Sequence, residues 1–364
     1  MRRYVLVVIL FFNVLVLLAQ QRPIFPVSHV DKRVELISIA CRLANINGFN
    51  DAVNTVYIKA IDTHFKKFSG HPFVQYLSSF KQRLDTAYWE VLALAVHINQ
   101  PPALKPLLGY NDTAWVDMWE DRTMFNEKIV LLLQSFYRET RCATFFASQQ
   151  LYYNLVKQQY ERKAVRVNYK WVQNFLGIGS TENYCPIIAL GIHVNYGAYM
   201  RVNYPSNHRD TYTIFTSENF NKNGVPGNFS DLMYYRSILH EYIHSYTNQL
   251  VDKNISALQK PAEILIANPK VYKLMKNTFY GNWQYLLYES LVRALVIKYI
   301  VKNDSDKHIK ERETIKQETL GFFWMKGLVQ QLDVYESRRS EYKSIAVFMP
   351  EIIRYFGTIA NDIK

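Results

Sequence analysis

The stretch His240-Glu241-Tyr242-Ile243-His244 decides how the rest of the chain is interpreted. One turn of an α-helix takes about 3.6 residues, so two histidines four positions apart project from the same side of a helix. Their imidazoles can then bind one metal ion together. Glu241 lies about 100° further round the helix, where it can flank the ion without having to bind it. The stretch therefore predicts two metal ligands and a general base within one and a half turns.

Residues 231–250 are expected to form the helix that carries this motif. Ser230 is a suitable N-cap, Asp231 suits the first turn, and neither Gly nor Pro follows before Pro261. Apolar residues at helical spacing run around the motif, which places the histidines close to buried surface. The H-E-x-x-H spacing is typical of zinc metallopeptidases. The alternative is a core helix with two hydrogen-bonded histidines, but an adjacent carboxylate is costly to bury without a function.

A zinc site needs at least a third protein ligand, and Glu289 is the best candidate. It is the only acid in the strongly apolar segment 283–297, which is expected to be a helix. A buried carboxylate must be paired or bound to a metal. Arg293, one turn later, could form an ordinary i,i+4 pair with Glu289. It could also orient a metal-binding Glu289 by a hydrogen bond to its carboxylate, without binding the metal itself. Glu263 and Asp252 are nearer in sequence, but Glu263 could also begin a helix, where an acid requires no metal.

Composition and charge limit the class of protein. The chain has 364 residues, 49% of them hydrophobic and 20% charged, which is typical of a globular protein with a large core. Its formal charge of +12 is scattered along the sequence. No Lys/Arg run or nucleic-acid motif is present, so no nucleic-acid partner is expected. The basic balance favours solubility or attraction to acidic partners.

Residues 1–19 are expected to be an export signal. Arg2 and Arg3 precede an apolar run, Val5–Leu18, and Ala19 is followed by polar residues. Cleavage after Ala19 is compatible with this pattern, although Leu17, two positions before Ala19, is larger than the small residue preferred there. If the segment is not cleaved, it would anchor the chain in the membrane. Localisation outside the cytoplasm, in the periplasm, at the cell surface or secreted, is therefore predicted, while the oligomeric state is left open.

No second metal site and no disulfide framework is predicted. The cysteines have no framework spacing, so buried apolar positions with at most one bridge are expected. Three further histidines have no partner at ligand spacing and are expected to be ordinary packing or surface residues. These cysteines and histidines are Cys41, Cys142, Cys185, His64, His71 and His97.

Periodicity divides the chain into regions. Residues 31–160 are expected to be helical, including one long helix over Pro72–Asn99. Residues 164–220 favour strands, at Val165–Val172, Ile187–Val194 and Thr211–Thr216, in a small, mainly antiparallel sheet. Helices are expected again after the motif. The predicted fold class is α+β, mainly α. The expected regions are 1–19 (signal or anchor), 20–162 (helical), 163–304 (sheet, motif helix and Glu289 helix) and 305–364 (C-terminal helices packed on the core).

The residues described so far resemble the gluzincin class of zinc metallopeptidases, whose hallmark is H-E-x-x-H with a glutamate ligand on a later helix. More narrowly, the chain is similar to a family of exported bacterial proteins catalogued as a domain of unknown function and regarded as candidate metallopeptidases. The similarity covers nearly the whole mature chain. It implies a zincin-like core, Zn²⁺ bound by His240, His244 and Glu289, and Glu241 as the base. The matching stretches are Glu35–Leu43, His71-Pro72, Ala95-Val96-His97, His240–Leu250 and Met349–Ile353.

The leading hypothesis is an exported zinc-dependent peptidase with a peptide or protein substrate. An edge strand beside the metal could hold an extended substrate by main-chain pairing. An oxyanion requires one further donor, and the sequence leaves this residue open. The candidates for this donor and for polar groups facing the site are Tyr288, Arg293, Tyr280, Tyr184, His193 and Tyr196. The alternatives are a non-catalytic exported protein that binds zinc or another surface, and a hydrolase of another bond, such as an amide of a cell-wall peptide.

Overall fold

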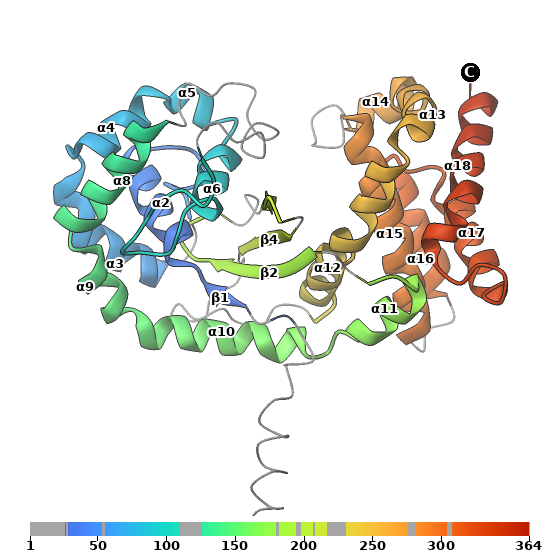
Figure 1. Cartoon of the computed structure of the whole chain (residues 1–364), viewed down its shortest axis with the longest axis horizontal. Coiled ribbons are helices and arrows are strands. Elements are labelled where there is room, and N and C mark those ends of the chain that lie inside the picture. Colours follow the sequence, from blue (N-terminus) through green and yellow to red (C-terminus); the bar gives the residue numbers. More distant parts are fainter. Residues whose placement is uncertain are drawn as a thin grey trace, which may run out of the picture.

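The computed structural model describes residues 26, 28–52, 55–109, 126–179, 182–193, 198–206, 208–216, 231–275, 282–303 and 308–363. Helices dominate this part of the chain, and one small sheet lies between two groups of them (Figure 1). The fold is therefore α+β and mainly α, as the periodicity predicted. The export signal, Ser230, Tyr196 and Tyr280 lie outside the described residues.

The first group of helices packs around α2. Asp31 caps α2, because its carboxylate accepts a hydrogen bond from the backbone N–H of Arg33. The single helix expected over Pro72–Asn99 is instead three short helices; Asp85, after the second of them, accepts from the backbone of Asn47 and pairs with Lys81. The group comprises α2 (Lys32–Leu43), α3 (Thr55–Phe65), η1 (Lys66–Phe68), α4 (Pro72–Ser79), α5 (Lys81–Leu84), α6 (Trp89–Val96), α8 (Glu127–Glu139), α9 (Cys142–Ser148) and α10 (Gln150–Ala164).

The sheet is mixed, so the prediction of a mainly antiparallel sheet was wrong. Its strands are β1 (His29–Val30), β2 (Glu182–Ala189), β3 (Ala198–Asn203) and β4 (Arg209–Thr216), in the order β1-β2-β4-β3. Only β3 and β4 are antiparallel, whereas β2 is parallel to both β1 and β4. Burial gives the reason: Ile187, Ile188 and Ala189 are consecutive and all buried, as in a strand covered on both faces.

The strand predicted at Val165–Val172 is also wrong. Its β-branched valines favour a strand, but the local capping groups favour a helix. Asn168 accepts a hydrogen bond from the backbone N–H of Trp171 and begins α11 (Tyr169–Leu176). Gly177 ends this helix in the left-handed region, with φ of 63°.

The second group of helices carries the motif. The helix predicted over residues 231–250 is α12, and the Glu289 helix is α15; these two helices pack directly against each other. Most of α15 is buried, because it packs against α12, α13, α16 and α17 (Figure 1). The group comprises α12 (Asp231–Lys253), α13 (Ile255–Ala267), α14 (Pro269–Met275), α15 (Trp283–Asn303), α16 (Ile309–Thr319), α17 (Met325–Ser337) and α18 (Ile345–Asp362).

Aromatic contacts join α12 to the sheet. The ring of Tyr184 in β2 meets that of Tyr242 edge-on at a centroid distance of 5.5 Å. The ring of Tyr199 in β3 lies 5.4 Å from that of His244. The motif helix is thus held between the sheet and α15.

Two further expectations concern the cysteines and the membrane. Cys41 and Cys142 are buried, Cys185 is half-buried, and all three thiols are free. Among the helices described, none combines the length and the apolar character that crossing a bilayer requires.

Candidate metal centre

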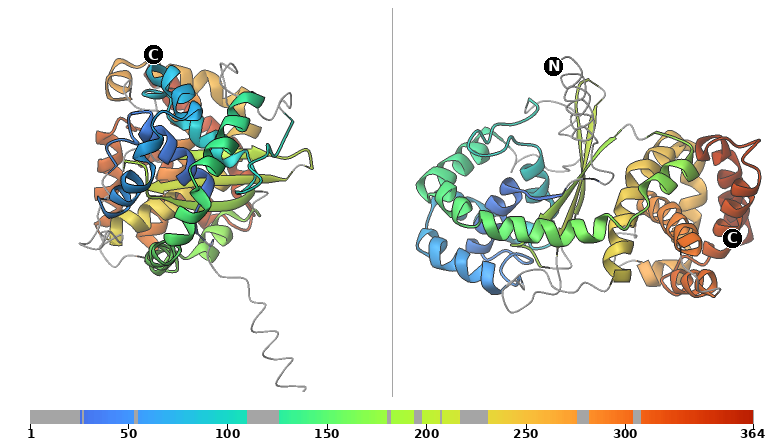
Figure 2. Two further views of the ribbon diagram at one scale, coloured as in Figure 1. Left: turned by 90° about the vertical axis from the view of Figure 1, so that its left-hand side faces the viewer. Right: turned by 90° about the horizontal axis from the view of Figure 1, so that it is seen from below.

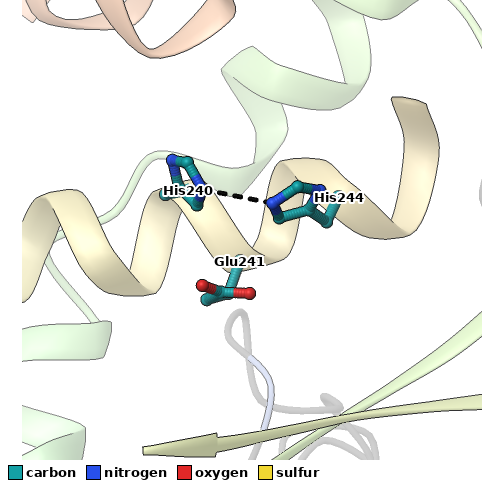
Figure 3. Close-up of side chains that lie close together, drawn as sticks. All are labelled: His240, Glu241 and His244. Atoms are coloured by element: carbon teal, nitrogen blue, oxygen red, sulfur yellow. Dashed lines mark hydrogen bonds between the residues drawn. The ribbon is translucent and has the colours of Figure 1, made fainter. Parts of the chain in front are cut away.

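The two histidines of the motif point to one position beside α12. The Nε2 atoms of His240 and His244 lie 3.1 Å apart (Figure 3). The rings come from successive turns of one helix, so this approach follows directly from the i,i+4 spacing. Two ring nitrogens that face each other at this distance can share one ion.

Glu289 of α15 brings a carboxylate to the same position as the two imidazoles. Its Oε1 lies 3.3 Å from Nε2 of His244, and its Oε2 lies 3.5 Å from Nε2 of His240. Donors held about 2.0–2.2 Å from one tetrahedral ion are roughly 3.3–3.6 Å from each other. The two separations from Glu289 fall in this range, and the 3.1 Å between the imidazole nitrogens is slightly shorter. Two imidazoles and one carboxylate also form a donor set that zinc prefers.

Glu241 places a second carboxylate nearby. One of its oxygens and one nitrogen of each imidazole lie within 4.8 Å of one another. In Figure 3 this carboxylate stands beside the imidazole pair, on the side of α12 that faces a strand. Of the two carboxylates, Glu289 is the one with an oxygen within 3.5 Å of each motif imidazole. Glu241 is then close enough to act on a molecule bound next to the ion.

The charges of the centre favour an anionic carboxylate at Glu289. Burial would raise the pKa of Glu289, but His240, His244 and Arg293 outweigh burial and hold this pKa well below its ordinary value. Burial would lower the pKa of His244, but the neighbouring Glu289 carboxylate outweighs burial and raises it. The Glu289 carboxylate therefore stabilises positive charge beside it.

Asn248 fixes the orientation of His244 and is a site residue that was not predicted from the sequence. Its Oδ1 lies 2.9 Å from Nδ1 of His244, and both side chains are buried. An amide oxygen only accepts hydrogen bonds, so Nδ1 carries a proton. In the neutral ring, Nε2 is then the nitrogen left free to bind a metal ion. The i,i+4 spacing from His244 could have indicated this partner.

Arg293 forms the i,i+4 pair with Glu289 that the sequence predicted as one of two alternatives. Its Nε donates to Oε2 of Glu289 at 2.8 Å, and its Nη1 donates to Gln317 at 2.7 Å. The guanidinium also lies over the ring of Phe322, 4.9 Å from its centroid. Because Arg293 is held by three groups, it can fix the Glu289 carboxylate.

Tyr288 was a candidate catalytic residue, but its hydroxyl lies in a different network. It donates to the carboxylate of Asp252, at the end of α12, and accepts from Gln284 at 2.6 Å. Arg201 of β3 donates to the other oxygen of Asp252 at 3.1 Å. The hydroxyl hydrogen of Tyr288 is thus used to connect α15 with α12 and β3.

The other candidates are dispersed. The hydroxyl of Tyr184 is buried and has no hydrogen-bond partner among the described residues. Burial raises the pKa of Tyr184 well above its ordinary value, and the Glu241 carboxylate adds to this effect. The backbone of His193 donates to Gly48, and Glu263 on α13 accepts from Gln259. The three upstream histidines contact other groups: His64 the carbonyl of Thr140, His71 the backbone N–H of Phe73, and His97 the carbonyl of Ala93.

Comparison with known proteins gives a family and no activity. A family model described as a domain of unknown function (DUF4932) matches residues 27–355. No curated protein and no solved structure matches the chain. The zincin-like core therefore stays a prediction, and the geometry of the site is the basis on which a function can be proposed.

Proposed function

The chain belongs to the DUF4932 family, and on this premise we propose that it is an exported zinc-dependent peptidase. The observation that carries the proposal is the approach of Glu289 to within 3.3 and 3.5 Å of the two motif imidazoles. Two histidines one turn apart and a carboxylate from a second helix leave one tetrahedral position for water, as in catalytic zinc sites.

Each residue then has a defined role. His240, His244 and Glu289 would hold the ion, and Asn248 and Arg293 would orient these ligands. Bound Zn²⁺ would acidify a water molecule and polarise a peptide carbonyl. Glu241 would accept the proton of that water as it attacks, and would then donate it to the leaving amine.

The position of β3 suits an extended substrate. Among the described strands, β3 is at the end of the sheet and pairs only with β4. Its Tyr199 contacts His244, so the strand runs close to the centre. A peptide that pairs with the outer edge of β3 would bring its backbone near His244.

A non-catalytic zinc protein is the second candidate, and the proximity of Glu241 favours it. One oxygen of Glu241 lies within 4.8 Å of a nitrogen of each imidazole. Glu241 could therefore move closer and act as a fourth ligand, which would close the site. The role of Glu241 therefore separates a peptidase from a protein that uses zinc for stability.

The test measures zinc content and peptide hydrolysis in three variants of the full chain. Glu241→Gln should retain equimolar zinc and lose hydrolysis by about 10²- to 10⁴-fold, because a general base is removed. His244→Ala should lose both. Glu263→Gln, on the surface of α13, is the matched control and should lose neither. Undiminished hydrolysis in Glu241→Gln would exclude the base assignment, whereas loss of its zinc would favour the closed, non-catalytic site.

A further inference from the structure

Helix α10 presents an unusual outer surface. It lies across the underside of the molecule (Figure 2, right). Leu151, Leu155 and Val165 are 81%, 47% and 57% exposed. Together with the exposed Gln158 and Arg162 they follow positions i, i+4, i+7, i+11 and i+14, which fall on one side of a helix. These five residues are here called the α10 stripe.

The stripe and its continuation are apolar and basic. No member of the stripe is acidic, and exposed Arg166 and Lys170 follow it along the chain. Glu161 lies beside the stripe and pairs with Lys157 at 3.6 Å. Cations in the last turn of a helix also favour its dipole, but this effect does not explain three exposed aliphatic side chains. A surface of this kind suits the boundary between lipid headgroups and acyl chains.

The chain enters the fold next to this helix. β1 packs against α10, and the apolar run Val5–Leu18, preceded by Arg2 and Arg3, lies just upstream. The ten peptide units from Leu18 to Ser28 extend over roughly 35 Å at most. A membrane that holds the apolar run is therefore within a short tether of the α10 stripe.

We propose that the α10 stripe docks on the anionic membrane across which the chain is exported. Leu151, Leu155 and Val165 enter the headgroup boundary, while Arg162 and Lys170 contact anionic headgroups. The opposite side of the molecule, where α13 and α14 lie (Figure 1), then points away from the lipid. This proposal does not depend on zinc or on peptidase activity.

The test uses the full chain on vesicles whose acyl chains are brominated and quench tryptophan. A tryptophan is added as Leu155→Trp on the stripe or, as a matched control, as Leu131→Trp on α8, where the leucine is 55% exposed. Flotation of each variant with the vesicles establishes that both are bound, so quenching then reports which side faces the lipid. On vesicles rich in phosphatidylglycerol, Leu155→Trp should lose most of its added fluorescence and Leu131→Trp almost none. Equal quenching of the two variants, or none at position 155, would overturn the proposal.

The charge requirement is tested in the Leu155→Trp background. Arg162→Gln with Lys170→Gln should reduce quenching several-fold, and pure phosphatidylcholine vesicles should do the same. Lys270→Gln with Lys326→Gln removes two exposed cations from α14 and α17 and should change nothing. Quenching that is independent of Arg162, Lys170 and lipid charge would contradict an anionic partner. A dimer that shields position 155 without lipid would assign the stripe to a second copy of the chain and overturn the proposal.

Discussion

At the scale of single residues, the partner of His244 determines which of its nitrogens can bind a metal. Replacing Asn248 by Ala removes the acceptor 2.9 Å from Nδ1 and lets the ring change both tautomer and orientation. Zinc affinity should fall about 10- to 100-fold, as is usual when a hydrogen bond behind a ligand is lost. Competition with a chromogenic chelator measures this change. Gln249→Ala, on the same helix turn, is the control, and equal affinities in the two variants would contradict the role of Asn248.

The residues of the site differ in how far the sequence could predict them. His240 and His244 are one helix turn apart, so local geometry brings them together. Glu289 was predicted because it is a lone acid on an apolar helix, and the structure brings it to both imidazoles. Asn248 carries a local signal that was overlooked. Tyr199 carries none, because its contact with His244 depends on the order of the strands.

At the scale of helices and strands, Asp252 connects three elements. Tyr288 of α15 and Arg201 of β3 both bind its carboxylate. Tyr288→Phe removes a hydrogen bond to a charged, partly buried group and should lower the free energy of unfolding by about 1.5–3 kcal/mol. Tyr285→Phe, on the same helix and 52% exposed, should change it by less than about 0.5 kcal/mol. Urea denaturation of the metal-free chain measures both, and equal stabilities would show that this connection is unimportant.

Gly177 is required where α11 ends. Its φ of 63° is unfavourable for other residues, and an added Cβ would lie 2.4 Å from the carbonyl oxygen of Lys343. Gly177→Ala should therefore destabilise the chain by about 2 kcal/mol or more. Gly357→Ala, inside α18 with open space around it, should stabilise by about 0.5–1 kcal/mol. A thermal melt of each variant gives the sign, and a neutral Gly177→Ala would refute the packing argument.

Elements with strong local signals were predicted best. α12 was found from the spacing of its apolar residues, and α15 from a long, strongly apolar segment. The segment Val165–Val172 was misassigned because its valines were given more weight than the Asn168 cap and Gly177. β1 has two residues and was not predicted, since nothing within so short a segment distinguishes a strand from a loop. Its partner β2 lies more than 150 residues downstream, so the pairing could not be inferred locally.

At the scale of the whole molecule, one buried acid joins the N-terminal helices to the sheet. Glu35 of α2 accepts a hydrogen bond from the backbone N–H of Leu190, which follows β2, at 2.8 Å. The side chain is fully buried. Burial raises the pKa of Glu35 to about 7, and nearby Asp31 adds to this effect, while hydrogen bonds from Leu190 and Tyr57 oppose it. The folded chain therefore favours the protonated form of Glu35 more than the unfolded chain does.

This preference predicts how stability changes with pH. Between the ordinary pKa of 4.5 and the folded value of about 7, the folded chain binds more protons than the unfolded chain, so its stability falls as pH rises. Ionisation of buried Glu35 lowers the free energy of unfolding by roughly 3.4 kcal/mol at most. Glu35→Gln keeps an acceptor for Leu190 and carries no charge, so its stability relative to the native chain should rise from pH 5 to about pH 7 and then level off. Urea denaturation at each pH, with a chelator present, measures the difference in free energy of unfolding between the variant and the native chain. Groups that titrate alike in both chains cancel from this difference. The exposed Glu263→Gln should show no such trend, and parallel curves for Glu35→Gln and the native chain would mean that Glu35 titrates normally in the folded protein.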